Sequence, residues 1–153
     1  MIQPRDSQES NGRLQLLSGD ECFELLATQP IGRLGVNDDR YPLIFPVNFA
    51  LDGRVIVIRT GPGTKLTHAS HANVTFEVDS FNPETRSGWS VLIRGLAEEL
   101  TAEHRPELVE RTLSAGVDPW ASGTRAHWLR LIPQAVTGRR IIPGDLPDVF
   151  AAS

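Results

Sequence analysis

The fold of this chain is decided by the stretch from Pro42 to Val78, PLIFPVNFALDGRVIVIRTGPGTKLTHASHANVTFEV. Two apolar runs, 42–51 and 54–60, are separated by Asp52-Gly53. An Asp-Gly pair between two such runs is a strong hairpin signal, because a type I′ turn requires positive φ at both central residues. Residues 74–78 then read as a further strand. The stretch therefore predicts a β-hairpin that reverses at Asp52-Gly53 and a third strand after it.

A glycine-rich turn, Gly61-Pro62-Gly63-Thr64-Lys65, follows the hairpin and leads into a short helical pattern that ends near His71. Backbone N–H groups that are free in such a turn attract anions, and a lysine adds a full positive charge. These residues indicate an anion site. Taken alone, however, they fit a solvated surface turn with an ordinary exposed lysine better.

Before this stretch, Ser18-Gly-Asp-Glu21 matches a capping box, in which a serine N-cap is followed three residues later by glutamate. The helix that it begins is expected to stop before Pro30. Its apolar face predicts burial of Cys22, Phe23, Leu25 and Leu26, with Cys22 as a small core residue rather than a reactive thiol. A short strand is expected over 31–36 and a turn over 37–40.

After the stretch, 80–88 reads as a loop and 89–100 as a long strand. Gly95 within that strand indicates a bulge or a close approach of backbone. A helix is expected from Thr101, as N-cap, to Leu113. Two strands, 128–132 and 135–142, should follow an irregular segment, with Pro133 between them marking a bulge or an edge position. About six strands with few helices predict a mainly β fold, a β-barrel with peripheral helices.

Length and composition fit one ordinary domain. The 153 residues are expected to divide into a flexible arm over 1–13, a domain over 14–142 and a tail over 143–153. A net charge of −4 argues against nucleic-acid binding, and no apolar run could span a bilayer. The polar N-terminus and the single cysteine, Cys22, predict a cytoplasmic protein.

Several short motifs occur together in one order along the chain: Pro46-Val47-Asn48-Phe49, Arg59-Thr60-Gly61-Pro62-Gly63-Thr64-Lys65, Phe76-Glu77-Val78-Asp79, Trp89-Ser90-Val91, Arg94-Gly95 and Thr137-Gly138-Arg139-Arg140. From about Leu17 to Ile142 the chain thus resembles the pyridoxamine 5′-phosphate oxidase-like flavin-binding split barrels. The resemblance implies a split β-barrel that binds flavin mononucleotide (FMN). It also implies a homodimer with the cofactor at the interface.

The resemblance assigns candidate roles to particular residues. It implies that Arg59, Thr60, Thr64 and Lys65 grip the phosphate of FMN, a dianion that needs a cation, hydroxyl groups and backbone N–H groups. It places Pro46, Val47 and Asn48 beside the flavin ring and makes Trp89 and Ser90 neighbours of the flavin. Alternatively, Asn48 is a polar residue satisfied within the barrel, and Trp89 belongs to the core or to an interface.

Side chains give little independent support for catalysis. His68 and His71 lie three residues apart, but no further ligand falls at metal spacing, so no metal site is expected. His71 could face a cofactor or substrate, although a polar helix end is the simpler interpretation. In the family, an arginine matching Arg139 or Arg140 helps to hold the substrate phosphate. True pyridoxamine 5′-phosphate oxidases continue into a longer arginine-rich signature, which this chain lacks.

The sequence therefore predicts an FMN-binding oxidoreductase that acts on a small molecule and is not a true pyridoxamine 5′-phosphate oxidase. Two alternatives remain. One is a deazaflavin-dependent reductase, because relatives with the same barrel take that coenzyme. The other is a binding or interaction protein without turnover.

Overall fold

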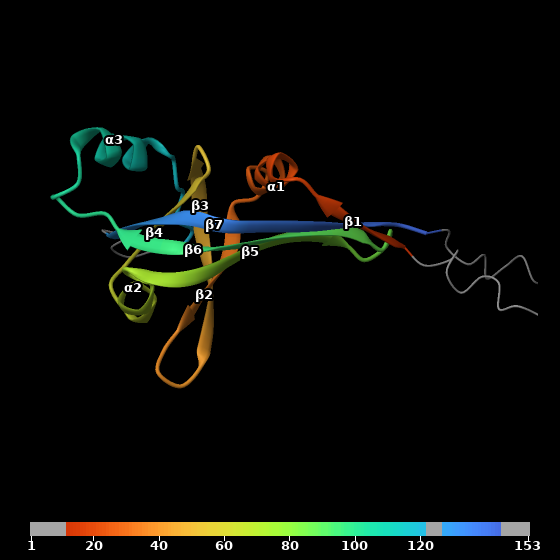
Figure 1. The fold of residues 1–153 in the computed structure, drawn as a ribbon, viewed down its shortest axis with the longest axis horizontal. Helices are drawn as coiled ribbons and strands as arrows, with labels where there is room; N and C mark the ends of the chain where they lie inside the picture. The colour runs from red at the N-terminus through yellow and green to blue at the C-terminus, as the bar shows by residue number, and fades with distance from the viewer. Residues whose placement is uncertain (1–11, 122–126, 145–153) are drawn as a thin grey trace, which may run out of the picture.

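The structure is a computed structural model that describes residues 12–121 and 127–144, except for the side chains of residues 64–66. Within these ranges the chain forms seven strands and three helices (Figure 1). In chain order they are β1 (Arg13–Leu17), α1 (Gly19–Leu26), β2 (Ile31–Asn37), β3 (Pro42–Asp52), β4 (Val55–Thr60), α2 (Thr64–Ala69), β5 (Ala72–Asn82), β6 (Ser87–Glu99), α3 (Pro106–Ser114) and β7 (His127–Ile142). No helix in the described ranges is long and apolar enough to cross a membrane.

The strands form one antiparallel sheet in the order β1-β7-β4-β3-β2-β5-β6, and β6 also pairs with β7. This second pairing closes six strands into a barrel and leaves β1 outside the closure. The long strand β7 makes the arrangement possible, because β6 pairs along one of its edges while β4 and β1 share the other. The predicted mainly β barrel with peripheral helices is confirmed, and Figure 1 shows α1, α2 and α3 around it.

The core lies inside the barrel and extends under α1. Phe49 from β3 meets Phe76 from β5 edge to face, with ring centroids 5.0 Å apart. Cys22 and Leu26 of α1 are fully buried, which confirms Cys22 as a core residue. At Gly138 on β7 a side chain would collide with the sulfur of Cys22, so this glycine lets α1 pack directly on the strand.

The predicted capping box at the start of α1 is confirmed, whereas the turn of the predicted hairpin lies one residue further along the chain. The capping box is present, since Ser18 Oγ accepts from the Glu21 N–H at 3.2 Å and the Glu21 carboxylate accepts from the Ser18 N–H at 3.1 Å. The hairpin exists, but its two central residues are Gly53 and Arg54 rather than Asp52-Gly53. Only Gly53 has a positive φ, 58°, which is the pattern of a type II′ turn with glycine first.

The C-terminal strands form one element rather than two. Strand β7 runs unbroken from His127 to Ile142, and a bulge opposite Arg94 and Gly95 accommodates Pro133. The predicted bulge and close approach at Gly95 are confirmed, because a side chain there would overlap the Ile132 carbonyl group. Proline breaks only one ladder bond, and the extra residue of a bulge absorbs that loss without ending the strand.

Three other boundaries were predicted wrongly. Helix α3 begins at Pro106 rather than near Thr101, because Arg105, the residue before a proline, has an extended ψ of 141° and acts as the N-cap. The predicted loop 80–88 is mostly strand, with β5 and β6 joined over 83–86. Strand β1 was assigned to no element, and its first residue, Arg13, to the expected flexible arm, because five mostly exposed residues are too short a run to signal a strand.

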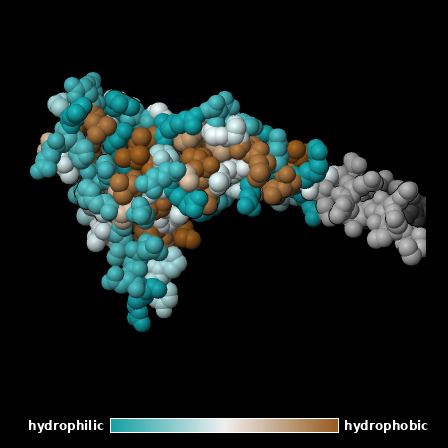
Figure 2. Space-filling model, viewed as in Figure 1, coloured by the Kyte–Doolittle hydropathy of each residue, from teal (hydrophilic) through white to brown (hydrophobic). Residues whose placement is uncertain are grey.

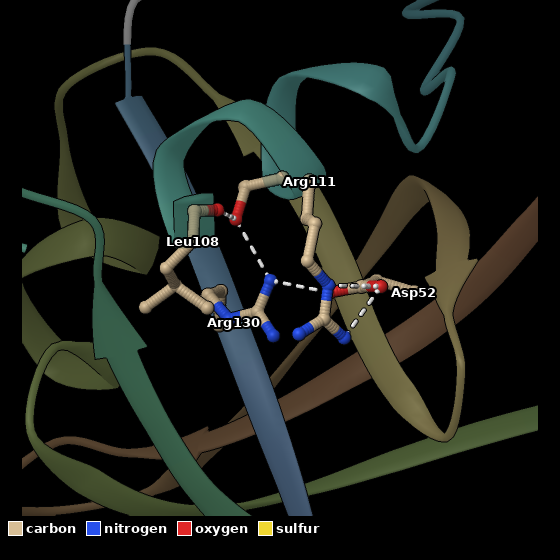
Figure 3. Close-up of polar contacts among 5 residues, drawn as sticks. Asp52, Leu108, Arg111 and Arg130 are labelled. Atoms are coloured by element: carbon tan, nitrogen blue, oxygen red, sulfur yellow. Dashed lines mark hydrogen bonds and ion pairs between the residues drawn. The ribbon is translucent and has the colours of Figure 1, made fainter. Parts of the chain in front are cut away.

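A largely buried ionic network ties α3 to the hairpin (Figure 3). Nη1 of Arg130 on β7 lies 2.9 Å from a carboxylate oxygen of Asp52 and donates to Thr112 Oγ1 at 2.7 Å. Arg111 donates to the other oxygen of Asp52 at 3.0 Å. Burial opposes the charge of Asp52, yet the two guanidinium groups keep the pKa of this carboxyl below its ordinary value. The network therefore fixes where α3 lies.

We expect Asp52→Ala to destabilise the fold by about 3 kcal/mol, because it leaves the Arg130 cation, with only 7% of its side chain exposed, without a counter-charge. The matched control is Asp20→Ala, which removes an exposed ion pair with Arg54 and should cost at most about 1 kcal/mol. Urea unfolding measures both. Equal losses in the two variants would show that the network does not stabilise the fold.

Candidate functional site

Three neighbouring strands carry Asn48, Arg59 and Trp128 on the outer surface of the barrel. Phe49 and Ile58 are paired and point into the core, so Asn48 and Arg59, the next residues along these two strands, lie on the opposite face. Arg59 is in turn paired with Trp128 on β7, and its guanidinium carbon lies 5.1 Å from the tryptophan ring centroid. This outer row combines a cation held over an aromatic ring with an amide.

Asn48 joins three segments of the chain. Its Nδ2 donates to the Pro30 carbonyl at 3.3 Å, and its Oδ1 accepts from the backbone N–H of Trp120 at 2.9 Å. Both ends of the amide thus have partners within the chain. The prediction that Asn48 contacts a flavin stays a prediction.

The glycine-rich turn begins where β4 ends, immediately after Arg59. Thr60 is buried, and its hydroxyl donates to the Gly61 carbonyl at 3.2 Å, so it belongs to the interior. Pro62 and Gly63 are exposed, and the Gly63 carbonyl accepts from both the N–H and the hydroxyl of Thr67. The side chains of Thr64 and Lys65 lie outside the described residues. Of the four predicted phosphate contacts, Arg59 is therefore the one whose described side chain faces outward.

The remaining predicted residues fall into two groups. Pro46 is exposed beside the outer row, whereas Val47 is buried, so only its backbone could meet a ligand. Trp89 and Ser90 lie on β6 opposite Arg140 and Arg139 of β7, whereas the outer row meets β7 at Trp128, near the other end of that strand. Trp89 packs partly against the core, while Ser90 is paired with Asp79 and Arg139. A single chain does not bring these two groups together.

A charged cluster occupies the sheet between those groups. Nη1 of Arg33 on β2 lies 3.1 Å from the Glu77 carboxylate and 3.0 Å from that of Asp79, both on β5. Partial burial, and next the neighbouring Asp79, raise the pKa of Glu77 to about 7. The alternation in Phe76-Glu77-Val78-Asp79 could have revealed two carboxylates on one face, but the sequence analysis gave them no role.

Comparison with known proteins identifies the family of this chain. A profile of the family described as pyridoxamine 5′-phosphate oxidase matches residues 18–140. The chain belongs to the pyridoxamine 5′-phosphate oxidase family. Among curated proteins, Rv0080 of Mycobacterium tuberculosis is 33% identical over 145 residues, which span 90% of this chain and 92% of that protein.

Solved structures of this family share the fold. The FAD-binding protein of Mycobacterium smegmatis is 35% identical, with a TM-score of 0.72 over 82% of this chain and 98% of that one. A FAD-binding protein of Mesorhizobium loti is 26% identical, with a TM-score of 0.68 over 85% of this chain and 98% of that one. The resemblance to flavin-binding split barrels that the sequence predicted is confirmed.

The structure gives positions for two further candidate residues, His71 and Arg139, but no contact that indicates a role. His71 is exposed, with a left-handed φ of 55° just after α2, and Arg139 is exposed on β7 opposite Ser90. Among the described residues, no group of three or more His, Cys, Asp or Glu side chains could hold a metal ion.

The sequence analysis gave no role to Trp120, whose backbone N–H contacts Asn48. It treated 114–123 as an irregular segment, in which a tryptophan has no periodicity to place it. The available signal was an aromatic residue within a segment too polar and too rich in Gly and Pro to form a core.

The raised pKa of Glu77 predicts a pH-dependent stability. The unfolded chain regains the ordinary value of 4.5, so from there up to about pH 7 the folded state binds more protons than the unfolded state. The free energy of unfolding should therefore fall as pH rises through this window, and Glu77→Gln should remove that contribution. Urea unfolding at several pH values measures it, with the exposed Glu84→Gln as control. Parallel profiles for wild type and Glu77→Gln would refute the assignment.

Proposed function

We propose that this protein binds a flavin on the outer face of its barrel and uses it to oxidise or reduce a small molecule. The observation that carries the proposal is the outer row, in which Arg59 lies over Trp128 directly beside an exposed glycine turn. An arginine next to an exposed glycine-containing turn suits a phosphate, and an aromatic surface suits a planar ring. Both features match what a flavin nucleotide presents.

The residues of the chain would bind and orient the cofactor. Arg59 and Lys65 would hold the phosphate at the turn, with backbone groups of 61–64. Backbone groups of 46–48 would face the polar edge of the ring, because the side chains of Val47 and Asn48 are engaged within the chain. The flavin, when bound, supplies the electron transfer.

The form of the cofactor is part of the proposal. The sequence favours FMN, whereas two structural relatives are described as FAD-binding. A deazaflavin is the alternative that the sequence analysis raised. The visible spectrum of purified protein separates flavin, which absorbs at about 450 nm, from deazaflavin, which absorbs at about 420 nm. Chromatography of the released chromophore then separates FMN from FAD, and a colourless protein that takes up neither would contradict the proposal.

Oxidation of pyridoxamine 5′-phosphate itself is not proposed. After Arg139 and Arg140 the chain continues Ile-Ile-Pro-Gly, without the longer arginine-rich signature of those enzymes. The substrate is therefore another small molecule. A cytoplasmic location stays a prediction from the sequence.

The site is proposed to be completed by a second copy of the chain. Ser90 and Trp89 lie near the end of β7 that is remote from Trp128, too far along the strand for them to share one ligand with the outer row. A two-fold dimer would bring the face that carries Ser90 to the partner's row. The face that carries Ser90 is also apolar for a free surface. Its exposed side chains include Leu14 at 59%, Leu16 at 77% and Leu92 at 40% exposure.

The same apolar surface extends to the end of the sheet. Phe81 and Ile141 are exposed there and line a cavity of about 540 Å³ with Leu14. Figure 2 shows apolar residues gathered over this extended part of the molecule. Large exposed apolar patches are typical of protein interfaces, so this face is the proposed dimer contact.

We expect Lys65→Ala to weaken FMN binding by about tenfold and riboflavin binding far less, because riboflavin has no phosphate for a charge-assisted contact. Titration of the apoprotein with each ligand measures the two affinities. Arg40→Ala, which removes an exposed cation outside the proposed site, is the control. Equal losses for FMN and riboflavin would show that Lys65 does not serve the phosphate.

If the ligand spans two copies, its binding and dimerisation are linked, so FMN should shift dilute protein from monomer to dimer. Sedimentation velocity at several protein concentrations, with and without FMN, measures this shift. Leu16→Glu, which places a charge on the proposed contact face, should weaken both association and FMN affinity. A monomer that binds FMN one-to-one with unchanged affinity would contradict the shared site.

A further inference from the structure

Trp120 is a large aromatic side chain that the fold leaves exposed. It lies between α3 and β7, and 65% of its surface is accessible. Within the described part of the chain, its ring has no aromatic or cationic partner of the kind that Trp128 finds in Arg59. A tryptophan usually buries much of its ring, so an exposed one on an anchored backbone is a candidate contact for a ligand.

The backbone around Trp120 is held in place. Val117, three residues earlier, is buried with 7% exposure, and the Trp120 N–H donates to Oδ1 of Asn48 at 2.9 Å. Helix α3, from which this segment continues, is itself fixed by the Asp52–Arg130–Thr112 network. The indole is therefore presented from an anchored position rather than from a free loop.

The anchor also places the backbone of Trp120 beside the outer row. Asn48 carries the hydrogen bond to Trp120 and is the neighbour of Arg59 across β3 and β4. The residues that precede and include Asn48 are those proposed to face the edge of the flavin ring. A planar ring lying along 46–48 would thus have Trp120 within reach of its surface.

We propose that Trp120 forms an aromatic wall of the ligand site and packs against the flavin ring system, an inference that rests on the proposed function. The ligand chemistry that this wall recognises is a planar, electron-poor heteroaromatic ring. Because every flavin carries the same ring system, Trp120 contributes to riboflavin, FMN and FAD alike. It is a positioning and affinity residue that takes no part in proton transfer.

The test compares Trp120→Ala with Trp120→Phe, which keeps an aromatic face. Leu113→Ala is the matched control, because Leu113 is an exposed apolar residue on the adjoining helix, at 51% exposure. Affinities of full-length apoprotein for riboflavin, FMN and FAD are measured by titration. Loss of one aromatic stacking contact weakens binding by roughly tenfold. Trp120→Ala should show this loss for all three ligands, while Trp120→Phe and Leu113→Ala remain within about twofold of wild type.

A second readout is independent of affinity. An indole packed on a flavin quenches its fluorescence, so FMN bound to Trp120→Ala or Trp120→Phe should fluoresce more strongly than FMN bound to wild type. A role in folding alone would leave the fluorescence of bound FMN unchanged. Thermal unfolding of the apoproteins confirms that the variants are folded.

The outcomes separate this inference from the proposed function. If wild-type protein binds none of the three flavins, both are overturned. If wild type binds flavin and Trp120→Ala binds it equally well with unchanged fluorescence, only the role of Trp120 is overturned. A loss confined to FAD would place the indole against the adenine and would also overturn contact with the flavin ring.

Discussion

The fold depends on one long antiparallel ladder, the pairing of β6 with β7. Strand β7 has sixteen residues, and both of its edges are used. One edge follows β6 for nearly the whole length, while the other is divided between β4 at residues 127–131 and β1 at residues 138–142. A closed barrel and an extension beyond it can therefore share one strand. Glycines at two crowded points make this possible, since Gly95 permits the bulge and Gly138 admits α1 against the strand.

The same strand positions the candidate site. At its barrel end Trp128 faces outward under Arg59, and Arg130 turns toward the buried carboxylate of Asp52. That ion pair fixes α3, and the segment after α3 returns to Asn48 through the Trp120 N–H. At its other end β7 carries Arg139 next to Ser90, among exposed leucines. The proposed ligand-binding face thus lies at one end of the strand and the proposed association face at the other, which is why the proposed site takes residues from two copies.

Sequence reasoning succeeded where short-range chemistry decides the structure. The capping box at Ser18, the hairpin near Asp52 and the bulge at Gly95 each follow from a few adjacent residues. It failed where the deciding contact is distant. The continuity of β7 through Pro133 depends on the ladder with β6, and β1 forms because an edge of β7 is free to pair with it.

For the candidate site, too, local features could be predicted from the sequence and distant contacts could not. Arg59 and the glycine turn could be predicted from one motif, together with the family resemblance. The separation of Ser90 from Asn48 could not, since it depends on the register in which β4 and β6 pair with β7. The anchoring of Trp120 by a residue 72 positions away in the chain left no local pattern to recognise.

A crystal structure of the protein grown with FMN tests the central claim most directly. It should show the phosphate at the turn after Arg59 and the ring between 46–48 of one copy and the Ser90 face of another. A flavin held by one chain alone, or in the cavity lined by Leu14 and Phe81, would contradict the account.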